Sequence, residues 1–254
     1  MVSTRRPTIA SRTLAEQLRP VVDIHRSIQD RGYATVDVEL VRARIRSGRT
    51  GFDAAMLLED AGDLTHAFAQ TTCAMELAGL VSTPQVLAFG QLRVESNVFV
   101  VGWANAESTP IDPAMQFGRR VAGVVGNAIL SRISREVMAG IPAVTRLPWR
   151  RPDCPCCAAS PDLAFTTEAR RYLVCWRCDA TWRTEHRGCL SCGALIPPAL
   201  VRIPSPYLGY ELAICNACGR YLKERRGGFT HDPIVERALT AGLDDAARLR
   251  GLRT

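Results

Sequence analysis

Eight of the ten cysteines in this 254-residue chain form four Cys-x-x-Cys pairs within residues 154–218. These pairs are Cys154/Cys157, Cys175/Cys178, Cys189/Cys192 and Cys215/Cys218. A Cys-x-x-Cys turn brings two sulfur atoms to one point, and a tetrahedral metal ion with sulfur ligands needs two such turns facing each other. The eight thiols are therefore the expected ligands of two metal ions per chain. Zinc and iron both accept four thiolates, so the spacing leaves the choice between them open.

The lengths of the intervening segments indicate which pairs meet. Seventeen residues lie between the first and second pairs, and 22 lie between the third and fourth. Either length suits a β-hairpin that joins two metal-binding turns. Only ten residues lie between the second and third pairs, so this segment is expected to connect two units. We therefore expect the first pair to meet the second and the third to meet the fourth. An interleaved arrangement, first with third and second with fourth, stays open.

Disulfide bonds and a redox dithiol are the other uses of paired cysteines. A disulfide framework needs an oxidising compartment. We expect no secretory segment, because Arg5-Arg6 are not followed by the continuous apolar run of a signal sequence. A redox enzyme uses one pair in a thioredoxin-like βαβ setting, which the sequence around the four pairs does not provide. We expect Cys156 to be a thiol that binds no metal, and Cys73 to be a small buried residue.

The residue after each pair also bears on the local geometry. A metal-binding turn often requires a positive φ at that position, which glycine adopts without a Cβ clash. Gly193 and Gly219 occupy it after the third and fourth pairs. Asp179 tolerates the same conformation moderately well. Ala158 does not, so the first turn is the least typical of the four.

Composition limits the classes of function. A continuous apolar stretch of 18 residues is missing from the sequence, so we expect no membrane span. Residues 1–148 hold 16 basic and 14 acidic side chains, and residues 149–254 hold 16 and 11, which gives +2 and +5. Two four-thiolate sites with divalent ions add about −4 and leave the C-terminal part near about +1. This cancellation argues against a nucleic-acid partner.

A zinc-ribbon protein that binds nucleic acid is nevertheless the alternative function. The basic excess and the ribbon-like spacing favour it, and Arg220, Lys223, Arg225 and Arg226 form the densest basic cluster of the chain. We expect the isolated His25 and His66 to lie at the surface or at helix caps and to bind no metal.

Apolar periodicity predicts that the first 148 residues are mainly helical. The expected helices cover residues 13–18, 20–32, 37–46 and 64–77, a segment from Pro84, and a long run from Asp112-Pro113 to Gly140. Residues 92–103 fit a helix or a strand equally well. Asp63 is a plausible N-cap, and Pro84 lies where a first-turn proline is tolerated.

Short strands are expected around the cysteines. The predicted strands cover residues 163–167, 171–174, 181–186, 200–203, 210–214 and 221–223, with a terminal helix over 232–249. The first two and the fourth and fifth would form hairpins. We expect Tyr172, Trp176, Trp182 and Tyr221 to cover the metal sites. So small a β-region buries too little apolar surface to be stable alone, so bound metal is expected to supply the missing stability.

The resulting fold class is α+β. We expect a helical domain over 1–148, a first four-cysteine metal module over 149–188, and a second four-cysteine metal module with the C-terminal helix over 189–254. Pro142, Pro148 and Pro152 mark the linker between the helical domain and the first module.

The residues that flank the cysteines resemble the formate dehydrogenase accessory protein family (FdhE). The resemblance covers about residues 150–225. Its specific parts are Arg171-Tyr172-Leu173 before the second pair, Trp182 four residues after it, and Cys218-Gly219-Arg220-Tyr221-Leu222-Lys223 at the fourth. The chain departs from the family pattern at Ala158, where glycine is usual, and in a less acidic segment before Cys215.

The resemblance implies both a fold and a role. It implies an α-helical domain followed by two rubredoxin-like modules, with iron as a candidate metal. It also implies a cytoplasmic maturation factor that is not an enzyme and has no catalytic residues. Its partner would be the catalytic subunit of a molybdenum- or tungsten-dependent formate dehydrogenase.

Overall fold

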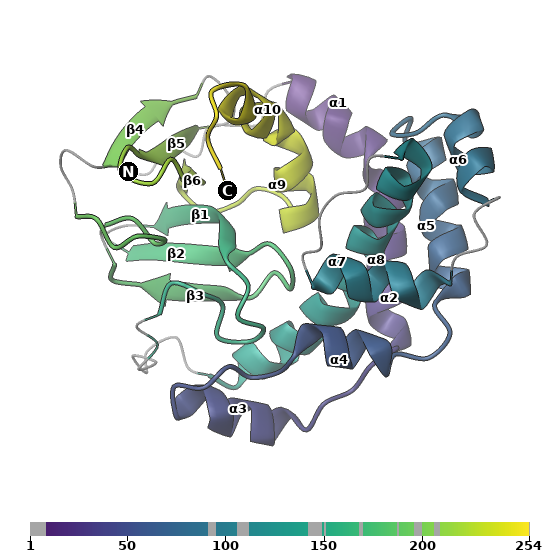
Figure 1. Cartoon of the computed structure of the whole chain (residues 1–254), viewed down its shortest axis with the longest axis horizontal. Helices are drawn as coiled ribbons and strands as arrows, with labels where there is room; N and C mark the ends of the chain where they lie inside the picture. The colour runs from purple at the N-terminus through teal and green to yellow at the C-terminus, as the bar shows by residue number, and fades with distance from the viewer. Residues whose placement is uncertain are drawn as a thin grey trace.

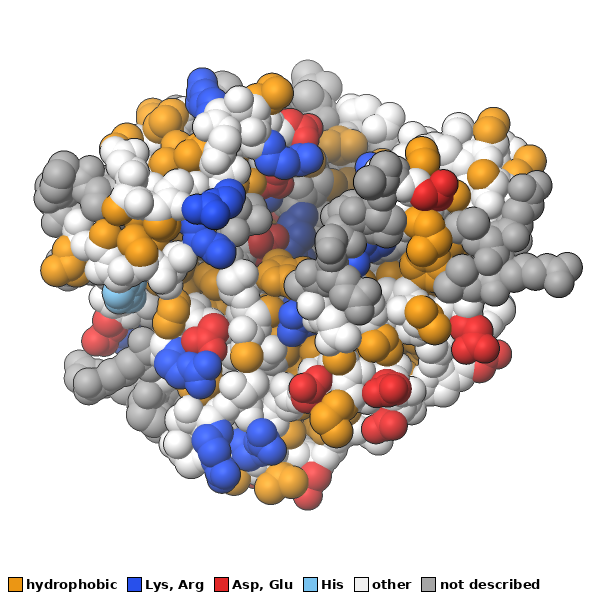
Figure 2. All heavy atoms as spheres, viewed as in Figure 1, with side chains coloured by type: hydrophobic (Ala, Val, Ile, Leu, Met, Phe, Trp, Pro, Cys, Tyr) orange, Lys and Arg blue, Asp and Glu red, His pale blue; other side chains and the backbone are white. Residues whose placement is uncertain are grey.

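The structure is a computed structural model of the chain. It describes residues 9–90, 95–105, 112–141, 149, 151–167, 170–186, 188–195, 200–205 and 209–253. An N-terminal helical part packs beside a mixed β-sheet, and two short helices lie against the sheet near the C-terminus (Figure 1). The predicted α+β class is therefore confirmed. Figure 2 shows that the surface is hollowed where the helical part meets the sheet.

The predicted long helix is α8 (Pro113–Ala139), the central element of the helical part. Its N-terminus is capped by Asp112, whose side chain accepts a hydrogen bond from the Met115 N–H. Most of its apolar stripe is buried. At Gly126 a Cβ would come within 2.5 Å of the Trp103 ring, so only glycine allows this close approach. α8 therefore lies at the centre of the helical part, where most of the other helices pack against it and its buried residues share a core with part of the sheet.

The described N-terminal residues form seven further helices, most of which pack against α8. They are α1 (Ile9–Gln17), α2 (Arg19–Arg31), α3 (Val38–Arg46), α4 (Ala54–Glu59), α5 (Thr65–Leu77), α6 (Thr83–Gly90) and α7 (Ser96–Ala104). The ambiguous segment 92–103 is helical from Ser96 onward, and residues 92–94 lie outside the described residues. Where the structure is described, no helix is both long enough and apolar enough to span a membrane.

Three expectations about the helical part were wrong or incomplete. Cys73 is exposed on α5, because it lies on the face turned away from the buried Ala74 and Met75. His25 is buried and bonded to Asn127 of α8, so it is neither a surface nor a cap residue. The short helix α4 was not predicted, because six residues show too little periodicity. Its signal is Asp53, which accepts hydrogen bonds from two N–H groups of the first turn.

Six strands form one sheet in the order β3-β2-β1-β6-β5-β4. They are β1 (Pro161–Thr167), β2 (Arg170–Cys175), β3 (Thr181–Thr184), β4 (Leu200–Pro204), β5 (Tyr210–Cys215) and β6 (Tyr221–Arg226). All six predicted strands and both predicted hairpins are present. β1 and β6 pair in parallel, while the other neighbours are antiparallel.

The sheet therefore consists of two three-stranded units that face the same way, β1-β2-β3 and β4-β5-β6. They join through the parallel β1–β6 pair. The predicted boundary between modules, at residues 188/189, falls between these units. The domain boundaries themselves stay predictions, and Pro142 and Pro148 of the expected linker lie outside the described residues.

The two faces of the sheet pack differently. One face contributes Leu163, Val174 and Leu212 to a cluster with Leu243 and Ala247 near the C-terminus. The opposite face contributes side chains to the large core that continues into the helical part: Ala164, Leu173, Trp182, Ala213 and Leu222. The sheet thus packs against C-terminal residues on one face and against the helical part on the other.

The predicted terminal helix over 232–249 is two helices, α9 (Pro233–Leu239) and α10 (Ala241–Leu249). The break is at Thr240, which is buried and non-helical, with φ −105°. Its hydroxyl donates to the Glu236 carbonyl at 2.7 Å. Such back-bonding by threonine competes with helical geometry. The apolar periodicity that predicted one helix does not reveal this hydrogen bond.

Candidate metal centres

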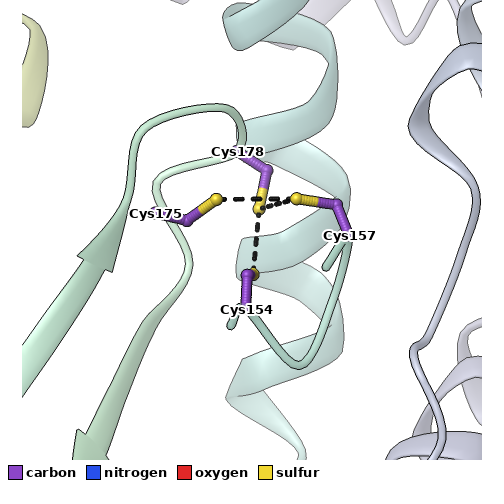
Figure 3. Close-up of side chains that lie close together, drawn as sticks. All are labelled: Cys154, Cys157, Cys175 and Cys178. Atoms are coloured by element: carbon purple, nitrogen blue, oxygen red, sulfur yellow. Dashed lines mark hydrogen bonds between the residues drawn. The ribbon is translucent and has the colours of Figure 1, made fainter. Parts of the chain in front are cut away.

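The structure brings the eight paired cysteines into two groups of four. Within each group the sulfur atoms all lie within 4.8 Å of one another. The first cluster is Cys154, Cys157, Cys175 and Cys178, and the second cluster is Cys189, Cys192, Cys215 and Cys218. The first pair therefore meets the second and the third meets the fourth, as the spacing predicts, and the interleaved arrangement is not observed. Figure 3 shows the first cluster in front of a helix.

All four Cys-x-x-Cys turns close in the same way. The N–H of the first cysteine donates to the carbonyl five residues later, and the N–H four residues later donates back to the carbonyl of that cysteine. In the first turn these bonds are Cys154 N to Ala159 O, 2.8 Å, and Ala158 N to Cys154 O, 2.9 Å. Backbone hydrogen bonds thus close each turn and set the spacing of its two cysteines.

The residue after each pair has the predicted positive φ. The values are 59° at Ala158, 53° at Asp179, 73° at Gly193 and 68° at Gly219. An L-residue with a Cβ is strained in this region by about 1–2 kcal/mol. Ala158 therefore carries strain that Gly193 and Gly219 avoid.

We expect Ala158→Gly to stabilise the metal-loaded protein by roughly 0.5–1 kcal/mol, because glycine removes the Cβ strain at an exposed position. Urea unfolding of both proteins measures the change. The neighbouring Ala159→Gly is the matched control: Ala159 is buried and lacks a positive φ, so this change should destabilise. A loss of stability in Ala158→Gly would contradict the strain argument.

The sulfur separations fit a tetrahedral ion. In the first cluster the separations are 3.6 Å for Cys154–Cys178 and 3.5 Å for both Cys157–Cys175 and Cys157–Cys178. A metal–sulfur bond of about 2.3 Å in a regular tetrahedron separates neighbouring sulfurs by about 3.8 Å. A disulfide would need about 2.05 Å. The clusters therefore have the dimensions of metal sites and not of cystines.

Burial opposes the ionisation of two thiols of the first cluster. It raises the pKa of the Cys154 and Cys178 thiols well above their usual range. Backbone N–H groups point at two other thiols, since Arg177 N lies 3.4 Å from Cys175 Sγ and Ser191 N lies 3.4 Å from Cys189 Sγ. These donors cannot balance four thiolate charges, whereas a divalent cation can.

The first cluster lies between the sheet and the helical part. The loop between α3 and α4 pairs with its first turn, through Gly51 N to Pro155 O at 2.9 Å and Phe52 N to Cys156 O at 2.8 Å. A Cβ on Gly51 would lie 2.8 Å from a Val41 methyl group, so glycine is required there. Cys156 itself lies outside the group of four sulfurs, and its expected lack of a ligand role stays a prediction.

α8 holds the second turn of the first cluster. Asn127 Nδ2 donates to the Arg177 carbonyl at 3.2 Å, and the Ser134 hydroxyl donates to the Cys178 carbonyl. Trp176, within that turn, packs edge-on against Trp103 of α7 at 5.2 Å between ring centroids. The helical part thus contacts both turns of the first cluster.

Arg237 of α9 holds the same turn from the other side. Its guanidinium donates to Asp162 at 2.7 Å, to Asp179 at 2.7 Å and to the Cys175 carbonyl at 2.8 Å. One side chain therefore ties α9, the start of β1 and the turn at Cys175 together. The pairing is bidentate at Asp162, a geometry that lysine cannot reproduce.

Sequence reasoning missed these supporting residues. The signal for the α8 contacts was present, because Asn127, Ser131 and Ser134 interrupt an otherwise apolar stripe and are buried. Buried polar residues of this kind bond to a partner element. Nothing in the sequence around Arg237 indicated its role, since its partners lie 58–75 residues away.

The second cluster is more open than the first. Cys189 and Cys215 are buried, whereas Cys192 is exposed and Cys218 is half-buried. Its support comes from nearby chain and from the C-terminal residues. His186 bonds the Cys189 carbonyl at 3.1 Å, and the Arg253 guanidinium donates to the Cys218 carbonyl at 3.1 Å. A Cβ on Gly188 would lie 2.5 Å from the Ala194 carbonyl oxygen, so the third turn also requires glycine at its entrance.

The remaining predicted aromatics are placed as follows. Trp182 is buried in the large core. Tyr172 stacks on Phe165 at 5.1 Å, and the Tyr221 hydroxyl donates to Asp244 of α10 at 2.7 Å. Tyr172 and Tyr221 therefore help to fix the sheet and α10, while Trp176 fixes the first cluster to α7.

His25 supports the first cluster indirectly. Its Nε2 lies 2.7 Å from the Asn127 side-chain oxygen, and Asn127 holds the turn of Cys178. Burial lowers the pKa of His25 below its ordinary 6.5. The unfolded chain therefore binds this proton more tightly than the folded protein does, so the stability supplied by neutral His25 is complete above pH 6.5. It decreases as the pH falls from there toward the lowered pKa.

We accordingly expect His25→Gln to reduce the loss of stability on acidification. Urea unfolding of the metal-loaded protein at about pH 7.5 and about pH 5.5 measures the loss in each variant. Metal release at low pH affects both proteins, so the difference between them isolates His25. His66→Gln, at an exposed position of α5, should behave as the unchanged protein. An equal loss in His25→Gln would contradict this role.

Comparison with known proteins shows a likeness of fold. No protein-family model matches the sequence, and no curated protein matches it. The crystal structure of the FdhE protein from Pseudomonas aeruginosa superposes with a TM-score of 0.60 at 19% sequence identity. The match covers 93% of this chain and 84% of that one. The chain therefore has the fold of the Pseudomonas aeruginosa FdhE protein over nearly its whole length.

Proposed function

We propose that the chain is a cytoplasmic accessory protein for the maturation of formate dehydrogenase, and that it binds the catalytic subunit of that enzyme. The observation that carries this proposal is the combination of an FdhE-like fold with two complete four-cysteine clusters. The residues around the second and fourth Cys-x-x-Cys pairs, which resemble the same family, support it independently of the fold.

In this proposal each cluster holds one iron or zinc ion through the four cysteines named above. A bound ion supplies a cross-link among thiolates and replaces the apolar core that the small sheet cannot build. In the first cluster this cross-link also fixes the sheet to α8 and α9, because both helices bond to the turn of Cys175 and Cys178.

We propose further that the protein is not an enzyme. A dithiol oxidoreductase needs a Cys-x-x-Cys pair whose two thiols are free to cycle. Here each of the four pairs faces another pair at 3.5–3.7 Å between sulfurs. This arrangement favours metal binding over thiol–disulfide chemistry at every pair.

The structure weakens the case for nucleic-acid binding. Three members of the basic cluster on β6 have acidic partners: Lys223 with Asp244, Arg225 with Glu236, and Arg226 with Glu211. Lys223 and Arg225 are also buried. Phosphate binding needs exposed and unbalanced positive charge, which these side chains do not offer.

Metal content is the first test. Protein purified without oxygen should contain two ions per chain by elemental analysis. A red colour with charge-transfer absorption identifies ferric iron, and a colourless loaded protein identifies zinc. Protein that remains folded without any bound ion would refute the metal-binding part of the proposal.

The client is tested separately. The tagged chain should retain the catalytic subunit of formate dehydrogenase from extracts of its own organism, and deletion of its gene should lower formate dehydrogenase activity. Complementation with the unchanged gene should restore the activity, while complementation with Cys178→Ser should not. Unchanged activity after deletion would refute the accessory role.

A further inference from the structure

The two clusters have the same ligands but unequal surroundings. All four cysteines of the first cluster are buried, whereas the second contains one exposed and one half-buried cysteine. The turns themselves do not differ, because all four close with the same pair of backbone hydrogen bonds. The difference is therefore one of access and not of ligand geometry.

Access to the first cluster is closed on three sides. The α3–α4 loop pairs with the turn that carries Cys154 and Cys157, and α8 bonds to the turn that carries Cys178. Arg237 and Trp103 pack on the remaining parts of that second turn. An incoming ligand could reach these sulfurs only after the helical part separates from the sheet, which is a large opening with a high free-energy cost.

Access to the second cluster needs no such opening. The thiol of Cys192 is exposed, and the nearby Leu195 is 72% exposed. The edge strand β4 begins at Leu200, which pairs with Cys215, and it has a neighbour on one side only in the described sheet. Solvent and small ligands therefore reach one corner of the expected tetrahedron while Cys189 and Cys215 stay buried behind it.

We propose that the second cluster is an exchangeable metal site with Cys192 as its first ligand to dissociate, and that the first cluster keeps its ion as long as the protein is folded. This inference rests on the metal binding proposed above. The acceptor it suits is a thiol-bearing molecule or protein segment that takes up thiophilic ions.

The exchange step is a ligand substitution without a redox change. A thiolate of the acceptor forms a bond to the ion at the exposed corner, the bond from the ion to Cys192 Sγ breaks, and the released thiolate takes a proton from water. Repetition at the half-buried Cys218 and then at the two buried cysteines transfers the ion. The chain would thus hold one permanent and one transferable ion.

Thiol alkylation during chelation tests this order, and the chain contains its own two controls. The protein loaded with two ions is mixed with a chromogenic chelator and an alkylating reagent, and labelled cysteines are followed by mass spectrometry. Cys73 is exposed and outside both clusters, so it reports the reagent. Cys156 is fully buried and outside the group of four, so it reports unfolding.

We expect Cys73 to be labelled at once and Cys192 next, in step with the release of one ion. That ion should leave roughly a hundredfold faster than the other. The first-cluster cysteines should be labelled together with Cys156, when the protein unfolds. Release of both ions at one rate, or labelling of Cys156 together with Cys192, would overturn the inference.

A variant separates this outcome from a failure of metal binding itself. Cys192→Ser should still fold and bind the first ion, and its second ion should leave faster than in the unchanged protein. If the unchanged protein binds no ion at all, the proposed metal sites fail. If both proteins bind two ions and Cys192→Ser releases them at the same rates as the unchanged protein, metal binding stands. The role of Cys192 as the first ligand to dissociate is then refuted.

Discussion

Replacement of Cys178 by serine is expected to unfold most of the protein, whereas the same replacement at Cys192 is expected to leave the helical part folded. Apparent binding energies of about 10–16 kcal/mol for structural Zn²⁺ at four ligands act as folding energy. Domains of ordinary size are stable by only about 5–15 kcal/mol. Loss of one ligand therefore removes a large share of the total stability wherever the rest of the fold depends on that site.

The two sites differ in how much of the fold depends on them. The turn of Cys178 receives hydrogen bonds from α8 and α9, and the facing turn pairs with the α3–α4 loop. Disorder in the first cluster therefore removes contacts on both sides of the junction. The second cluster bonds to adjacent chain and to the C-terminal residues, so its loss is expected to remain local.

Circular dichroism at about 222 nm during heating measures the helical content of each variant. Cys178→Ser should have little cooperative unfolding left, and Cys192→Ser should retain the transition of the helical part. Cys156→Ser is the matched control, since Cys156 is buried beside the first cluster but outside its group of four. If Cys156→Ser instead abolishes metal loading, the assignment of ligands is wrong.

Arg237→Met is expected to destabilise the protein by about 3 kcal/mol or more, the cost of leaving buried charges without their partner. Asp162 and Asp179 both lose their cation, and the Cys175 carbonyl loses a donor. The side chains of Arg237, Asp162 and Asp179 are 21%, 17% and 13% exposed, so solvent screens the loss only in part.

Urea unfolding measures this change, and two further variants interpret it. Arg248→Met removes an arginine that pairs with Asp245 while 70% exposed, and it should shift stability by less than about 0.5 kcal/mol. Arg237→Lys should recover only part of the loss, because an ammonium cannot bond two carboxylates and a carbonyl with a planar fork. Equal effects of Arg237→Met and Arg248→Met would show that the contacts at Cys175 carry no special weight.

Local features of the structure were predictable from sequence. The spacing of the cysteines predicted which pairs meet, because a hairpin between two turns has a limited range of lengths. The positive φ after each pair followed from the glycines at 193 and 219, and it extends to Ala158 and Asp179. The strands followed from the same pattern, since each metal-binding turn requires a strand on at least one side.

Long-range features were not predictable. The bonds from Arg237 to Asp162 and Asp179 join residues far apart in sequence, and no local pattern distinguishes this arginine from exposed ones. The break at Thr240 depends on a single hydroxyl group that bonds to Glu236. The unequal exposure of Cys192 and Cys178 could not be predicted, because the Cys-x-x-Cys spacing does not indicate which distant element of the chain will cover each pair.

The parallel junction of β1 and β6 explains why two clusters with the same ligands differ in burial. Two units joined in the same orientation have different neighbours, whereas two units related by a twofold axis would have equivalent surroundings. The unit that carries the first cluster has turns that bond to α8 and to the α3–α4 loop, whereas the turns of the other unit bond to adjacent chain and to the C-terminal residues. Two copies of one motif can in this way differ in the solvent exposure of their cysteines, although the coordinating residues are the same.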